Sequence, residues 1–416
     1  MGRATKYKII LLMFFLFMFL GNILRLIPLS TALGSFNIFE LVLYASCLLL
    51  LFFSWKDIRK FPGLFILIYS LFFVSYLIGA LRVQEVSTLA FTYNIRIFLM
   101  FITSYVIGLS FFRIYGSNLQ KVINFYIVVF VVNTIVAWVI YFIFPDASQL
   151  YAFLSLFGVI YHGDPHLHRL LGTLFDPNFF GNLLILPILM SLYLFDLTRK
   201  KKYLAVFIFL LFSEFFTFSR SSLLGLSLGL MFYYLPDIKT FINNCRIKKS
   251  LFINTVILAA SIVSIFYLFP DEIIRITERF TSLRQDESAA HRYNNFVLAM
   301  NLLSQIDVLI FGIGFNFFSY LGLTKLSSLD SSILALMVTL GVPMFSITAF
   351  TMKRFIVSSL LGFVKERLFV NKVYLNYLFV SLLLCNLNPL LLYPFWFFCM
   401  FPLLCYFRLN NTKSIR

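Results

Sequence analysis

KIILLMFFLFMFLGNIL, residues 8–24, is an apolar stretch whose one charged residue stands at its start. A helix needs about 20 apolar residues to cross the hydrocarbon core of a bilayer, which is about 30 Å thick. The stretch is too long for the apolar part of a signal peptide, and it lacks a small-residue cleavage site. We therefore expect it to be retained as a first membrane span over residues 9–29.

Stretches of this kind recur along the whole chain of 416 residues. Hydrophobic residues make up 61% of it. Charged residues make up only 12%, about half the share that is typical of a soluble protein. The sequence therefore predicts an all-α polytopic membrane protein of about twelve spans that forms one integral membrane domain, residues 1–416. The expected spans are residues 9–29, 36–54, 61–81, 93–112, 122–144, 178–197, 203–218, 221–235, 250–269, 331–350, 373–389 and 391–407.

The basic residues are distributed unevenly between the two sides of this predicted bundle. The chain has 34 lysines and arginines against 17 acidic residues, and most of the basic ones fall in loops on the side of both termini. Cytoplasmic loops carry such an excess of positive charge. We therefore expect both termini in the cytoplasm. Membrane topology, and not nucleic-acid binding, then accounts for most of the net charge of +17.

The basic residues on the opposite side are of another kind, because all but Lys325 are arginines. A guanidinium group offers a rigid fork of donors that suits phosphate or carboxylate, and an orientation signal needs only positive charge. This side is therefore predicted to hold an anion. For Arg275, Arg279 and Arg284, which have several acidic neighbours, we favour pairing within the loop instead.

Two predicted segments on that side, about 145–177 and 270–330, are too long to be turns. The apolar half of the first is expected to lie along the membrane interface. The second should contain a helix over AAHRYNNFVLAMNLL, residues 289–303, because helix start signals precede apolar residues at helical spacing. In LIFGIGFNFF, residues 309–318, glycines allow a tight backbone turn.

All the histidines fall in these two segments, where imidazole can exchange a proton near neutral pH: His162, His166, His168 and His291. The first three, with Asp164, could ligate a metal ion, but the loop offers no further residues to orient such ligands, and we predict no metal. The five cysteines show no metal-ligand spacing. The G-x-G of the second segment lacks the context of a nucleotide-binding fingerprint, and no cofactor is expected.

Several motifs follow one another in an order that is found in a known group of membrane enzymes. They are RLLGTLFDPNFFGN (169–182), FTFSRSSLLGL (216–226), HRYNNF (291–296) with FGIGFNFF (311–318), and LDSSILALMVTLGV (329–342). Each is weak alone, but their order and their placement in the predicted topology are more specific. Over residues 165–350 the chain resembles the O-antigen polymerase and O-antigen ligase superfamily.

The resemblance implies a glycosyltransferase C-like helical bundle with two larger extracytoplasmic loops, in the bacterial cytoplasmic membrane. It also implies transfer of a glycan from undecaprenyl pyrophosphate to a sugar hydroxyl on the outer face, with a chain-length regulator and a flippase as partners. In the ligase branch a histidine opens the tenth span. Here Asp330 takes that place, which favours the polymerase branch, making O-antigen or capsule.

The expected chemistry assigns roles to particular residues. Pyrophosphate is a good leaving group whose developing charge must be held, and preorganised cations do this well in a water-poor site. We expect Arg220, Arg169 and Arg292 to hold it, and Asp330 or, second, His291 to deprotonate the acceptor hydroxyl. The other residues predicted to contact substrate are Arg96, Asp176, Asn178, Gly312 and Gly314.

The predicted arginines have structural alternatives. Arg220 could pair with Glu214 if the helix ends between them, since six residues apart on one helix they would lie on different faces. Arg169 could extend along the apolar surface to the membrane interface. Arg292 could be an exposed helix residue. Arg96, inside a predicted span, should face either a cavity in the bundle or a carboxylate.

The polar residues near predicted helix starts have alternatives as well. Asp330 could be the N-cap of the tenth span instead of a base. Asp176 and Asn178 could bind sugar hydroxyls or cap the sixth span, and for Asn178 we favour the cap.

Two other functions fit the same features. One is a ligase that transfers the glycan to lipid A core or another acceptor. The other is a lipid-linked oligosaccharide flippase or an anion transporter, which would also place arginines within the membrane. Against a transporter, the sequence shows no paired repeats and no matched pair of broken helices, and its second loop is large.

Overall fold

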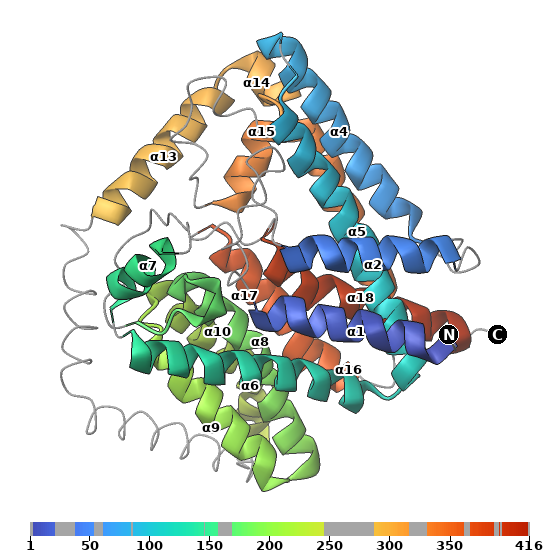
Figure 1. Ribbon diagram of the computed structural model, residues 1–416, viewed down its shortest axis with the longest axis vertical. Coiled ribbons are helices and arrows are strands. Elements are labelled where there is room, and N and C mark those ends of the chain that lie inside the picture. The colour runs from blue at the N-terminus through green and yellow to red at the C-terminus, as the bar shows by residue number, and fades with distance from the viewer. Residues whose placement is uncertain are drawn as a thin grey trace.

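The computed structural model of the protein shows a helical bundle (Figure 1). Every regular element in the part of the chain that the structure describes is a helix, which confirms the predicted all-α class. The described residues are 3–20, 38–53, 61–84, 86–144, 146–156, 169–244, 287–315, 331–361, 367–386, 391 and 393–414.

The helices follow one another along the chain from Arg3 to Ser414. The first are α1 (Arg3–Leu20), α2 (Ile38–Phe53), α4 (Gly63–Val83), α5 (Thr88–Tyr115), α6 (Leu119–Ile143), α7 (Ala147–Ser155) and the 3-10 turn η3 (Gly172–Leu174). Then come α8 (Pro177–Thr198), α9 (Lys201–Phe216), α10 (Arg220–Asn244), α13 (Glu287–Leu303) and α14 (Ile306–Phe311). The last are α15 (Ser332–Leu361), α16 (Arg367–Phe369), the π-helix η7 (Val370–Leu375), α17 (Asn376–Leu384) and α18 (Pro394–Ser414).

Among the described residues, six helices are long and apolar enough to cross a membrane: Gly63–Val83, Thr88–Tyr115, Leu119–Ile143, Pro177–Thr198, Ser332–Leu361 and Arg367–Leu384. A shorter apolar helix covers Glu40–Phe52. The protein is thus built of membrane-type helices, as expected. The number of twelve spans stays a prediction, and the expected span 250–269 lies outside the described residues.

The two long segments are described only in part. The helix expected over residues 289–303 is confirmed as α13. In the segment 145–177 the chain forms the short helix α7 and the turn η3, and residues 157–168 lie outside the described part. Residues 270–286 and 316–330 of the second segment lie outside it too.

Several helices begin at a polar side chain that accepts a hydrogen bond from the first turn. Ser87 Oγ accepts from Ala90 N (3.1 Å) at the start of α5, and Asn118 Oδ1 accepts from Lys121 N (3.2 Å) at the start of α6. Such N-caps satisfy donors that the helix itself leaves unpaired. The sequence therefore fixes where these helices begin.

The interior is centred on α8, whose residues from Phe180 to Phe195 are all buried. A helix that is apolar on every side belongs inside a bundle.

Helices α5 and α18 pack closely because residue 108 is a glycine. A Cβ at Gly108 of α5 would lie 2.6 Å from Cys405 Cβ of α18. In Figure 1, α4, α13, α14 and α15 occupy the upper part and α8, α9 and α10 the lower part.

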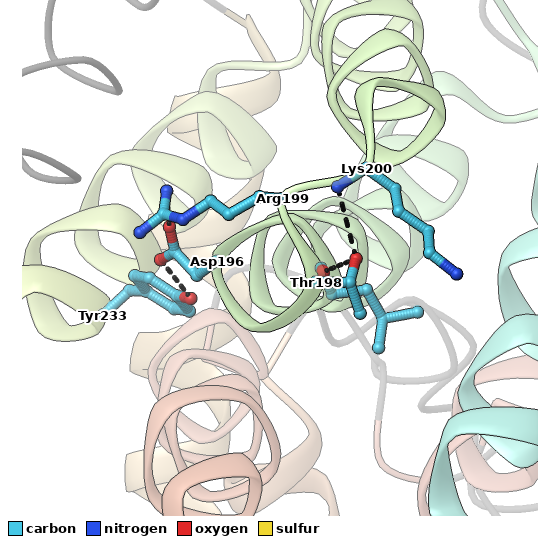
Figure 2. A network of polar contacts seen from close by, with 6 residues as sticks. Asp196, Thr198, Arg199, Lys200 and Tyr233 are labelled. Atoms are coloured by element: carbon cyan, nitrogen blue, oxygen red, sulfur yellow. Dashed lines mark hydrogen bonds and ion pairs between the residues drawn. The ribbon is translucent and has the colours of Figure 1, made fainter.

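A polar network fixes α8 against α10 at the C-terminal end of α8 (Figure 2). Asp196 accepts a hydrogen bond from Tyr233 OH of α10 (2.9 Å) and forms an ion pair with Arg199 (3.4 Å). Lys372 Nζ of η7 lies 4.6 Å from the centre of the Tyr233 ring. Because α8 and α10 are tied together here, the relative position of their other ends is also constrained.

Helix α15 is broken near its middle. Gly341 has a non-helical backbone (φ 74°, ψ 157°), and Pro343 has no N–H with which to bond the carbonyl oxygen of Thr339. That oxygen accepts instead from Gly314 N (3.1 Å) and from Ser75 Oγ of α4 (2.8 Å). The break in α15 thus joins three parts of the upper bundle.

Gly312 and Gly314, which we predicted to contact substrate, lie in this contact between helices. A Cβ on Gly312 would lie 2.3 Å from Thr339 O, and Ile313 N between the two glycines donates to Val338 O (2.9 Å). Nearby, an ion pair between Arg82 and Asp307 (2.9 Å) holds α14 to α4. The hydrogen bond that Arg82 donates lowers the pKa of the Asp307 carboxyl. The glycines are required here by close backbone packing and by their positive φ angles.

Gly314→Ala is expected to lower the free energy of unfolding by about 1–3 kcal/mol, the usual cost of overpacking. The new Cβ would lie 2.3 Å from Gly79 Cα, and the φ of +99° disfavours any side chain. Unfolding of the purified protein in detergent measures the change. Gly63→Ala is the matched control, because nothing lies within 4 Å of that Cβ position and the variant should unfold as the wild type does. Equal stability of the two variants would contradict the packing argument.

Candidate functional site

Helix α8 begins at an Asp-Pro pair. Asp176 Oδ1 accepts hydrogen bonds from Asn178 N (2.7 Å) and Phe179 N (3.2 Å), and Pro177 is the first helical residue. Aspartate at the N-cap and proline after it are the residues that favour a helix start. The cap is therefore Asp176, and the cap role that we favoured for Asn178 is wrong. The Asn178 side chain does not cap the helix, and its Oδ1 accepts a hydrogen bond from Arg169 instead.

Helices α9 and α10 are joined by a tight turn of three residues. Thr217 Oγ1 donates to the Glu214 carbonyl oxygen (2.8 Å), and Phe218 takes a left-handed backbone conformation (φ 47°). Ser219 Oγ then accepts from Ser222 N (3.3 Å), which makes Ser219 the N-cap of α10. Arg220 is consequently the first residue of the helix.

Arg169 connects this turn to the start of α8. Its Nε donates to the Thr217 carbonyl oxygen (2.8 Å), and its Nη2 donates to Asn178 Oδ1 (3.3 Å). The neighbouring Leu170 N donates to Phe216 O (2.8 Å). The Arg169 side chain is buried between the two helix starts, so it does not extend to an outer surface as the alternative required. Arg169 is thereby bonded to the turn that precedes Arg220, although the two arginines are 51 positions apart in sequence.

Arg220 is partly exposed, as are Asp176 and Asn178 at the start of α8. It does not pair with Glu214, because both carboxyl oxygens of Glu214 lack a hydrogen-bond partner and no ion pair joins the two residues in the described structure. The guanidinium stands at the N-terminus of a helix, where the partial positive charge of the helix adds to its own. This arrangement attracts an anion.

Two further helices begin near the same end of the bundle. The ring of Phe179 at the start of α8 stacks on that of Tyr393, which precedes α18 (4.2 Å between centroids). Leu391 N donates to Ser332 Oγ at the start of α15 (3.3 Å). The starts of α8, α15 and α18 are therefore adjacent, and α10 joins them through Arg169. All these helices direct the positive end of their dipoles to this end.

The predicted residues of the second loop are only partly described. Ser331 Oγ accepts from Leu334 N (3.3 Å), so Ser331 and not Asp330 occupies the N-cap position of α15. Asp330 lies outside the described residues. His291 and Arg292 lie in α13, but their side chains are outside the described part. The base and the third arginine of the predicted site therefore stay predictions, and so does the absence of a metal among the histidines of the first loop.

Arg96 lies in a separate site between α5 and α2. Its Nε and Nη2 donate to the two carboxyl oxygens of Glu40 (2.6 Å each), and Tyr44 OH also donates to Glu40 (2.6 Å). Both partners of this ion pair are largely buried. Of the two environments expected for Arg96, a carboxylate partner is the one observed, and we no longer place Arg96 among the substrate-binding residues.

Sequence reasoning missed the acceptors that position the site. Arg169 bonds to the backbone carbonyl of Thr217, and a carbonyl is present at every position, so it carries no signal in the sequence. The role of Ser219 had a signal, because serine before a run of helical residues is typical of an N-cap. Comparison of the chain with protein-family models and with curated proteins gives no match.

Proposed function

We propose that the protein is a membrane glycosyltransferase of the polymerase type. It would join undecaprenyl-pyrophosphate-linked repeat units into O-antigen or capsule on the outer face of the bacterial cytoplasmic membrane. The single observation that carries this proposal is the contact of Arg169 with Thr217 O and Asn178, which brings Arg220 to the start of α8. The order of motifs along the chain supports the choice of substrate.

The proposed anion is the pyrophosphate of the donor. Arg220 supplies a partly exposed guanidinium, and the starts of α8 and α10 supply backbone dipoles. Arg169 has its Nε and one terminal nitrogen engaged by the protein, so we assign it mainly to positioning. Arg292 of α13 is proposed as the third arginine. Such groups stabilise charge that develops on a leaving group without having to reorganise.

The proposed reaction is a displacement at the anomeric carbon of the donor. The acceptor hydroxyl oxygen forms a bond to this carbon while the bond to the pyrophosphate oxygen breaks, and the electron pair of that bond leaves with the pyrophosphate. The hydroxyl proton passes to a base, for which we propose Asp330 or His291. The energy resides in the donor linkage, so the reaction needs no nucleotide and no cofactor.

The proposed location follows from the uneven distribution of basic residues between the two sides of the bundle. Helix α1 begins and α18 ends on one side of the bundle (Figure 1), and the loops expected on that side hold most of the lysines. We propose that this side faces the cytoplasm, that the chain crosses the membrane twelve times in a glycosyltransferase C-like bundle, and that the arginine site faces outward. A chain-length regulator and a flippase would act with it.

Glycan analysis of a deletion strain tests the reaction. Loss of a polymerase is expected to leave single repeat units on the normal acceptor, and the wild-type gene should restore long chains. Loss of a ligase would instead leave long lipid-linked polymer that is not attached. Unchanged surface glycan, or lipid-linked single units confined to the cytoplasmic leaflet, would overturn the proposal, the latter in favour of a flippase.

A further inference from the structure

Glu214 is a carboxylic acid in an unusual environment. Its side chain is 0% exposed near the end of α9, and both of its carboxyl oxygens lack a hydrogen-bond partner among the described residues. The free energy cost of burying an unpaired carboxylate is roughly several kcal/mol, even after the protein relaxes around it. The other buried glutamate of the described bundle, Glu40, has an arginine and a tyrosine as donors. The two acids therefore require different explanations.

The Glu214 carboxyl lies between α8 and α10. A Cβ on Gly181 of α8 would lie 3.0 Å from Glu214 Oε1 and 2.4 Å from Ser222 Oγ of α10. Only a residue without a side chain fits between these groups. The carboxyl is thus held next to the first turn of α10, two residues beyond Arg220.

The hydroxyl groups around the carboxyl have already used their hydrogens. Ser222 Oγ donates to the Ser219 carbonyl oxygen (3.1 Å), and Thr217 Oγ1 donates to the Glu214 carbonyl oxygen (2.8 Å). A carbonyl oxygen cannot donate, so the direction of both bonds is fixed. While it donates to Ser219 O, Ser222 Oγ can accept a further hydrogen bond but cannot give one. A buried carboxylate needs hydrogen-bond donors from its surroundings, whereas a protonated carboxyl is neutral and carries a donor hydrogen itself.

Among the described residues, no positive group compensates for a charge on Glu214. Charged or titratable side chains on the elements around Glu214 include Arg169 before η3, Asp176 at the start of α8, Arg220 of α10, Tyr141 of α6 and Tyr377 of α17. None of them forms an ion pair or a hydrogen bond with the Glu214 carboxyl in the described structure. Tyr377 donates instead to the Asn182 carbonyl oxygen of α8 (3.2 Å).

We propose that Glu214 is a proton-binding site and carries a proton in the folded protein. A metal cation is the poorer occupant, because the helix starts and the arginines make this end of the bundle positive. Ionisation releases the proton to water and leaves a carboxylate directly behind the turn that holds Arg220. The site therefore couples the position of that turn to pH. This inference does not rest on the proposed glycan transfer.

Thermal unfolding of the purified full-length protein in detergent, with Glu214→Gln and without it, tests the proposal. The folded state binds the proton more tightly than the unfolded state, so the wild-type unfolding temperature should fall as the pH rises above about 5, where an ordinary glutamate in the unfolded chain is ionised, and level off once folded Glu214 has lost its proton. Glu214→Gln keeps a neutral side chain of the same shape, and its unfolding temperature should stay nearly constant over that range. Asp307→Asn is the control for an exposed acid: it removes an ion pair, but its unfolding temperature should fall with pH as that of the wild type does.

Infrared difference spectra of wild type against Glu214→Gln give a second readout that does not depend on folding energetics. They should show the C=O stretch of a protonated carboxyl in the wild type at neutral pH. A carboxylate band at neutral pH would overturn the proposal, as would a pH dependence that Glu214→Gln leaves unchanged. Stabilisation by sodium ions that only the wild type shows would also overturn it, because the occupant would then be a metal cation.

Discussion

Glu40→Gln is expected to lower the free energy of unfolding by about 3–5 kcal/mol, the cost of removing one partner from a buried ion pair. Arg96 would keep its charge but lose both carboxyl oxygens, each of which lies 2.6 Å from one of its nitrogens. Tyr44 would lose the charged acceptor of its hydroxyl at the same time. Chemical unfolding in mixed micelles measures the loss.

The matched variants for this prediction are Arg96→Met and the double variant Glu40→Gln/Arg96→Met. Removing both charges should recover much of the loss, because no unpaired charge is then left in the interior. Glu214→Gln is a useful comparison, since it changes the other buried glutamate and breaks no ion pair. If Glu40→Gln were as stable as the wild type, the ion pair would have no structural role.

Arg220→Ala is expected to reduce glycan transfer by about 100- to 1,000-fold with normal amounts of protein in the membrane, the usual loss when one preorganised donor to a developing negative charge is removed. Arg220 is partly exposed at the helix start, so its removal should leave folding nearly unchanged. Transfer is measured with purified lipid-linked donor in proteoliposomes. In cells, the variant should give short glycans.

Two arginine variants serve as controls for this prediction. Arg82→Ala removes an arginine whose partner, Asp307, is in α14 and outside the candidate site, so transfer should be unaffected. Arg220→Lys keeps the charge but not the fork of donors, and an intermediate rate is expected. Normal transfer by Arg220→Ala would rule out the proposed role of this residue.

The helices could be predicted because each long apolar run has one physical solution, a helix with satisfied backbone groups. The contacts of the arginines could not. The resemblance and the residue type selected Arg169 and Arg220, but only the fold shows that Arg169 bonds the turn before Arg220. Arg96 was expected to face a cavity or a carboxylate, and the choice of Glu40 required knowing which helices are neighbours.

The errors also have physical reasons. Asp176 and Asn178 are both good capping residues, and only the backbone conformation of Asp176 (φ −142°, ψ 117°) decides between them. Gly312 and Gly314 were expected to allow a tight backbone turn, and both have positive φ angles. A glycine does not say what approaches it, and here the neighbours are α15 and α4 and not a sugar.

The broken helix α15 has a mechanical consequence. Carbonyl oxygens that an intact helix would keep for itself are bonded to the stretch around Ile313 and to Ser75. Displacing α15 from the stretch around Ile313 or from α4 would therefore leave carbonyl oxygens of the buried residues Val338 and Thr339 without donors. A motion that carries α4, α14 and α15 together keeps every one of those bonds, so we expect this part of the molecule to move as one rigid body.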